Sequence, residues 1–264
     1  PLRAWDFPRR LYGDGMKSIL RGLLLLGLAA NAQSETLVDR LLASYDGVQS
    51  MQGEIRKETK SGDFEVRKLS RVYFARPDKL HVETSSPVKR RIVADGAQLY
   101  SYLEGDPMGF ARPVGQLDAD WLISLRQVPG TPMDQLLRLQ GLPEQELPAS
   151  EAAPVRRGYQ AATFFVVLEA DGLGRLLAVE FYTGPDLSQR TARFAYANYT
   201  ELAPGLWFPL LHKALIQQGG ATSEETTRVS NALVNQPIPE GLFLPAAFFK
   251  EVKFTPSLDE IYGN

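Results

Sequence analysis

The segment RIVADGAQLYSYL, residues 91–103, contains two runs of alternating residues on either side of Asp95-Gly96. Asp-Gly between two such runs is the strongest short-range signal for a β-hairpin, because the tight turn needs residues that tolerate positive φ angles. The segment therefore predicts two antiparallel strands, near 91–94 and 98–103. Similar short runs, separated by turn residues, continue on both sides of this hairpin.

Period-two alternation and closely spaced turns dominate the chain from residue 53 to residue 234. Consecutive strands that are joined by tight turns must pair antiparallel, since parallel pairs need long crossovers. The pattern therefore predicts one large, curved antiparallel sheet. Besides the hairpin, its strands are expected near 53–59, 64–75, 80–84, 162–169, 177–181, 194–196, 207–217 and 226–234.

Two segments show helical periodicity instead. Residues 34–49 place apolar side chains on one helix face, with Ser34 as a candidate N-cap, and residues 118–139 predict two short helices. Residues 143–157, rich in Pro, Glu and Ala, predict a surface loop. The fold class is thus mainly β (α+β), with an N-terminal helix and a mid-chain helical insertion available as a lid over the concave face.

The composition excludes several kinds of site. A chain of 264 residues with 44% hydrophobic side chains can bury its own core without disulfides or a metal. Its 29 basic and 31 acidic residues nearly cancel, which gives no general attraction to nucleic acid. With no cysteine, the chain has no disulfide, no thiolate nucleophile and no thiol-linked lipid anchor.

The first 32 residues predict export. Met16 opens a basic stretch, residues 22–30 are apolar, and Ala30-Asn31-Ala32 offers the small residues that a signal peptidase recognises. We expect a signal peptide at 16–32, cleaved near Ala32, an upstream segment at 1–15 outside the fold, and a single domain at 33–264. A short buried helix is the alternative, whereas a membrane anchor would need ~20 apolar residues. The expected location is the periplasm.

Catalytic motifs are missing from the sequence. The two histidines, His81 and His212, belong to no His-Glu-x-x-His pattern, and no Gly-x-Ser-x-Gly or phosphate-binding glycine loop occurs. Asp118 and Asp120 beside Trp121 suggest a carboxylate pair, but residues two apart on a helix do not face each other, and helix capping explains them better. We therefore expect no enzyme, no cofactor and no metal.

Several segments, in this order, resemble the LolA-type outer-membrane lipoprotein-sorting proteins. They are VYFARPDKL at 72–80 and VADGAQLYSY at 93–102, followed by GLWFP at 205–209 and NQPIPEGLF at 235–243. The resemblance spans roughly residues 34–250. It implies a half-open β-barrel, capped by helices, whose hollow takes up the acyl chains of lipoproteins at the inner membrane and delivers them toward the outer membrane.

The resemblance also implies roles for two residues. Arg76 matches the arginine that hydrogen-bonds to the helical lid and holds the empty cavity shut, and Leu80 stands near the cavity mouth. Physical chemistry supports the first role, because a guanidinium at the end of an apolar strand needs acceptors, and carbonyls at the end of a covering helix would serve. The alternative is an exposed arginine beside a turn. The run 89–91, Lys-Arg-Arg, could meet anionic lipid heads or protect an edge strand.

A carrier of this kind needs a cavity lined by alternate apolar side chains of the sheet. Periodicity does not tell which face of each strand points inward, and the same pattern would fill an ordinary core. Besides Arg76, the candidates are Tyr73, Leu80, Val82, Leu99, Phe165, Val179, Phe181, Phe194 and Trp207.

The predicted function is a periplasmic chaperone, expected to be monomeric, that binds acylated lipoproteins or lipids. Its partners would be an inner-membrane transporter as donor and an outer-membrane acceptor. The missing cysteine argues against the acceptor lipoproteins themselves. Two alternatives remain open: a lipid-sensing regulatory module of the RseB type, and a carrier that serves a dedicated lipid exporter.

Overall fold

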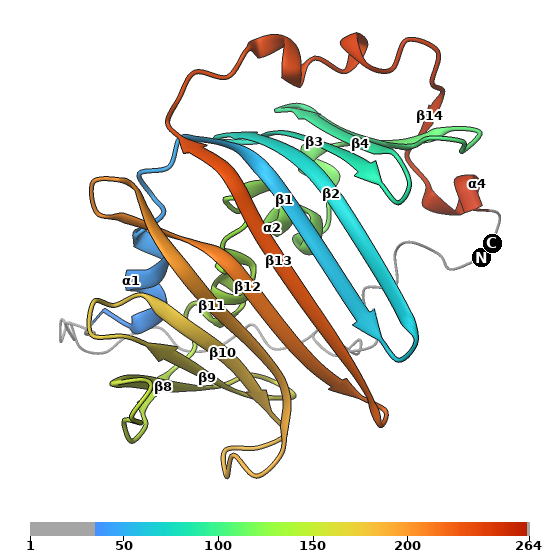
Figure 1. Cartoon of the computed structure of the whole chain (residues 1–264). Helices are drawn as coiled ribbons and strands as arrows, with labels where there is room; N and C mark the ends of the chain where they lie inside the picture. The colour runs from blue at the N-terminus through green and yellow to red at the C-terminus, as the bar shows by residue number, and fades with distance from the viewer. Residues whose placement is uncertain (1–34, 263–264) are drawn as a thin grey trace, which may run out of the picture. The chain divides into compact units, whose positions relative to one another are not determined.

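A single 14-stranded sheet organises the chain in the computed structural model, which describes residues 35–262 (Figure 1). The predicted upstream segment and signal peptide, residues 1–32, lie outside the described residues. Strands of the first half are β1 (Ser50–Ser61), β2 (Phe64–Ala75), β3 (Lys79–Ser86), β4 (Arg90–Asp95), β5 (Gln98–Leu103) and β6 (Gly109–Pro113). Those of the second half are β7 (Glu144–Glu146), β8 (Val155–Gln160), β9 (Phe165–Ala170), β10 (Leu176–Tyr182), β11 (Arg190–Ala203), β12 (Leu206–Gln218) and β13 (Ala221–Val234), and β14 (Phe254–Thr255) follows.

The strand order shows two antiparallel meanders, β1–β6 and β7–β13, joined where β1 pairs with β13. Within the described residues β14 and β7 form the two edges, so the sheet stays open as a half-barrel. The segment between β6 and β7 has to pass from one end of the sheet to the other. That passage carries the helical insertion across one face of the sheet, as the sequence predicted.

Three helices cover this face, and we call it the concave face. They are α1 (Leu37–Ala43), α2 (Ala119–Arg126) and α3 (Met133–Leu139). The predicted N-terminal helix is confirmed but is shorter than the expected 34–49, and its N-cap is Thr36, which forms a capping box with Asp39. Asp118 caps α2 by accepting a hydrogen bond from the Trp121 amide at 3.0 Å. The expected capping role of that aspartate is thus observed.

One continuous core joins the helices to the sheet. Strand residues alternate between the two faces. In β2, Val72 and Phe74 point to the helices, while Tyr73 between them points away. Leu41 of α1 and Leu136 of α3 belong to the same buried cluster. Burial of this cluster fixes the register, since a slip by one residue would turn every apolar side chain outward.

The C-terminal segment was not predicted, and it covers part of the opposite, convex face. After β13 the chain forms short turns, η2 (Glu240–Phe243) and η3 (Pro245–Ala247), then β14 and α4 (Leu258–Tyr262). β14 pairs with β6 in parallel, the one exception to the predicted antiparallel pairing among the described strands. Three further strands, β6, β7 and β8, were not predicted, and the expected loop at 143–157 contains β7 and the start of β8.

Candidate functional site

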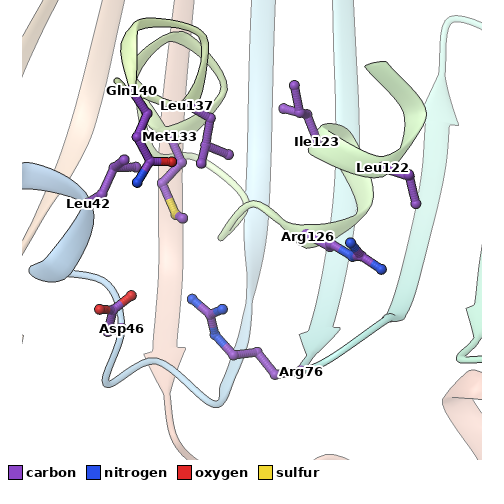
Figure 2. A pocket seen from close by; sticks show the side chains of 9 residues that line it. All are labelled: Leu42, Asp46, Arg76, Leu122, Ile123, Arg126, Met133, Leu137 and Gln140. Atoms are coloured by element: carbon purple, nitrogen blue, oxygen red, sulfur yellow. The ribbon is translucent and has the colours of Figure 1, made fainter. Parts of the chain in front are cut away.

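A cleft of about 360 Å³ opens among the three helices above the turn between β2 and β3 (Figure 2). Its apolar lining comes from the helices, and four polar side chains surround it. The apolar residues are Leu42, Leu122, Ile123, Met133 and Leu137, and the polar ones are Asp46, Arg76, Arg126 and Gln140.

The turn below the cleft, residues 76–78, contacts two of the helical segments. Arg76 donates from Nε to the Val48 carbonyl at 2.8 Å and from a terminal nitrogen to the Tyr45 carbonyl at 3.3 Å. Both carbonyls lie in the turns that follow α1, and the Tyr45 carbonyl also accepts from the Val48 amide at 3.1 Å. Asp78 accepts from Arg126, the last residue of α2, at 2.7 and 3.3 Å. One short turn therefore fastens the ends of α1 and α2.

The third helix is tied to the second and to the sheet. Arg138 of α3 donates to Asp120 of α2 at 2.6 Å. Gln135 accepts from the Tyr196 hydroxyl of β11 at 2.9 Å. These polar contacts at the rim leave the space between the helices to apolar side chains.

The buried tyrosines and the histidine beneath the helices are uncharged at neutral pH. Burial raises the pKa of Tyr45, Tyr196 and Tyr199. It also lowers the pKa of His212 to about 4, and the ring contacts the Pro209 carbonyl at 3.3 Å. Burial likewise raises the pKa of Asp134 in α3. The buried tyrosine and histidine side chains thus add no charge to this interior, which suits apolar ligand groups.

The predicted lining residues divide between the two faces of the sheet. Tyr73, Phe165 and Trp207 lie on the convex face: Tyr73 packs on His81, Phe165 belongs to a separate small cluster, and Trp207 is 36% exposed. Six residues lie on the concave face within or against the main core, namely Leu80, Val82, Leu99, Val179, Phe181 and Phe194. Of all predicted site residues, Arg76 alone lines the cleft.

The side chains that do line the cleft sit mainly on the helices. Leu122, Met133 and Leu137 show in the sequence as the apolar positions of the two short helices. Helical periodicity says that such residues face the protein, but it does not distinguish a packed position from one at the edge of a cleft.

Solved structures share this fold. A LolA superfamily protein from Nitrosomonas europaea aligns with a TM-score of 0.50 at 15% identity, over 79% of this chain and 96% of that one. A DUF1329 family protein from Desulfovibrio piger aligns with a TM-score of 0.52 at 12% identity, covering 80% and 95%. A putative outer membrane lipoprotein-sorting protein domain from Vibrio parahaemolyticus gives 0.51 at 14%, covering 78% and 94%.

The chain therefore has a LolA-like fold, an open antiparallel half-barrel with helices on its concave face. No protein-family model matches the sequence, and no curated protein matches it significantly. At these identities the likeness concerns the fold.

Two further features bear on the kind of site. Across residues 35–262, no helix has the length and apolar character to cross a bilayer. In the same part of the chain, no three His, Asp or Glu side chains gather as metal ligands would.

Proposed function

We propose that this protein is a periplasmic carrier that takes up the acyl chains of lipoproteins or lipids under its helices and passes them toward the outer membrane. The observation that carries the proposal is the cleft among α1, α2 and α3, which has an apolar lining and lies above the turn that fastens the ends of α1 and α2 to the sheet. The LolA-like fold supports it. An inner-membrane donor and an outer-membrane acceptor complete the proposed route, with the carrier acting as a monomer and catalysing no reaction.

The energetics of transfer require the helices to move. At about 0.8 kcal/mol per buried CH₂, a 16-carbon chain needs roughly 13 kcal/mol of apolar contact to leave a membrane. A cleft of about 360 Å³ lies at the lower end of the range for small-molecule sites. Larger cargo therefore has to displace helices from the concave face and use the apolar residues beneath them.

Binding can be tested with a fluorescent 16-carbon fatty acid and the delipidated protein. Leu122→Asp places a charge in the cleft, and we expect affinity to fall at least ten-fold, since a carboxylate beside an acyl chain must be desolvated. Leu173→Asp is the matched control, because Leu173 is 73% exposed in the β9–β10 turn. Native mass spectrometry of protein from a bacterial envelope identifies the natural cargo. Equal affinity of the two variants, or no binding by the unaltered protein, contradicts the proposal.

Arg76→Leu tests the hypothesis that Arg76 holds the empty cavity shut. Its loss removes two hydrogen bonds to the end of α1, so the open form becomes more populated and apparent affinity rises in proportion. We expect about ten-fold tighter fatty-acid binding and slower release to acceptor vesicles. Arg71→Leu, on the convex face of the same strand and paired with Glu54, should change neither. Unchanged uptake and release by Arg76→Leu refutes the hypothesis that Arg76 holds the empty cavity shut.

A further inference from the structure

The concave face changes in character along β2. From the 76–78 turn toward the β1–β2 hairpin tip, its inward residues are Phe74, Val72, Ser70 and Lys68. Phe74 lies opposite Leu80 of β3, and Val72 lies opposite Val82. The next row is polar, because the Ser70 hydroxyl bonds the Thr84 hydroxyl at 2.9 Å. Along β2 and β3 the concave face is therefore apolar near the helix ends and hydroxylic in the next row, and Lys68 follows on β2.

Three cationic side chains, Lys57, Lys68 and Arg90, lie on the concave face beside or beyond the hydroxyl groups. Lys68 lies directly opposite Lys57 in the β1–β2 register, and these two long strands lie side by side in Figure 1. Arg90 of β4 is opposite Thr84 and donates to the Ser101 hydroxyl at 2.8 Å. Like charges that face each other across a sheet are unfavourable, so their pairing at 57 and 68 suggests a role other than stability.

The acidic groups that the structure describes near these cations leave Lys68 without a close carboxylate. Glu225 of β13 forms an ion pair with Lys57. The buried carboxyl group of Asp134, from α3, also interacts with Lys57. Among the described residues no carboxylate lies within 4.0 Å of Lys68, whose pKa is lowered by partial desolvation in the concavity and by the charges of Arg90 and Lys57. The cluster keeps net positive charge, concentrated at Lys68.

We infer that the cargo is an amphiphile with an anionic, phosphate-type headgroup, whose acyl chains lie over the apolar rows while the headgroup contacts Lys68, Arg90 and Lys57. The inference rests on the proposed function and narrows its substrate class to anionic phospholipids. Lysine and arginine supply positive charge and hydrogen-bond donors, which suit the phosphate oxygens of an anionic headgroup, whereas the cationic ammonium of a zwitterionic headgroup would be repelled. The serine and threonine hydroxyls between the two regions fit the ester groups that join chains to headgroup.

The test compares two probes with the same 16-carbon chain, lysophosphatidylglycerol and lysophosphatidylcholine, as competitors of the fluorescent fatty acid. We expect the unaltered protein to prefer the anionic probe about ten-fold. Lys68→Gln should reduce the preference to about two-fold and leave the affinity for lysophosphatidylcholine unchanged. Arg67→Gln is the matched control: it removes a charge from the adjacent residue, which faces the convex side and pairs with Glu65. That variant should keep the full preference.

The outcomes separate the two proposals. Equal affinity for both probes, or equal loss in the Lys68→Gln and Arg67→Gln variants, overturns the headgroup inference while the carrier function stands. If inorganic phosphate displaces the anionic probe at equal concentration, the ligand is a soluble anion. This result also overturns the headgroup inference. If neither probe nor fatty acid binds, the carrier function itself fails. Circular dichroism of each variant checks that it is folded.

Discussion

Replacing Glu180 by glutamine is expected to lower the free energy of unfolding by about 3 kcal/mol at pH 7. Glu180 is 2% exposed on the convex side of β10 and accepts hydrogen bonds from the Tyr182 hydroxyl at 2.7 Å, from Arg190 at 2.8 Å and from Arg193. Removing one partner of a buried ion pair typically costs 3–5 kcal/mol, about 3 being expected here because both arginines are partly exposed. Urea unfolding followed by tryptophan fluorescence measures the change.

Glu104→Gln is the control for this prediction. Its pair with Lys89 has both side chains more than half exposed, and such pairs contribute less than about 1 kcal/mol.

The acid dependence gives a second check. Burial would raise the pKa of Glu180, but Tyr182, Arg193 and Arg190 lower it overall. Its stabilisation is therefore present above the ordinary carboxyl pKa and is lost as the pH falls through the lowered value. A loss below 1 kcal/mol at pH 7 would show that this network is not structural.

Most of the sheet could be predicted because most of its strands carry their own local signal. Asp95-Gly96 marks the hairpin of β4 and β5, and alternation marks β2, predicted and observed at 64–75. The short β7 and β14 could not be found this way. Three residues, Glu144–Glu146, and two, Phe254–Thr255, are too few to show a period, and their pairing depends on partners distant in sequence.

The cleft was less predictable than the sheet. Alternation identified apolar strand residues but not their faces, so Tyr73 and Trp207 were grouped with Leu80 although they lie on the opposite side. Tyr73 faces away from the helices because it is paired with His81 beneath the C-terminal segment. A sequence pattern alone does not reveal that a distant segment covers the second face of a strand, and with both faces covered the usual inside–outside contrast weakens.

His81→Phe is expected to make the protein less sensitive to acid. Between pH 7 and pH 4, its free energy of unfolding should fall by about 3 kcal/mol less than that of the unaltered protein. The His81 ring is 1% exposed on the convex face and tilted by 50° against Phe248, with 4.6 Å between ring centroids; neither ring nitrogen has a hydrogen-bond partner within 3.5 Å among the described residues. Burial and then the charge of Arg91 lower its pKa to about 4, although Glu83 and the Leu242 backbone act in the opposite direction.

The sign follows from comparing this pKa with the ordinary value near 6.5. Above pH 6.5 the ring is neutral in both folded and unfolded chains. As the pH falls from 6.5 to about 4, only the unfolded chain takes up the proton, so folding loses up to about 3 kcal/mol. Phenylalanine keeps the aromatic contact with Phe248 and removes this loss. Urea unfolding at pH 7 and pH 4 measures both proteins.

His212 provides the internal comparison, since its pKa is also lowered to about 4 but its ring contacts the Pro209 carbonyl. His81→Phe should therefore remove part of the acid sensitivity and keep the part that His212 contributes. His212→Phe should remove the remainder but cost stability at pH 7, because it leaves that carbonyl without its partner. An unchanged pH dependence in His81→Phe would mean that the C-terminal segment leaves the convex face before the ring is protonated, since separation from Phe248 restores an ordinary pKa in the folded chain.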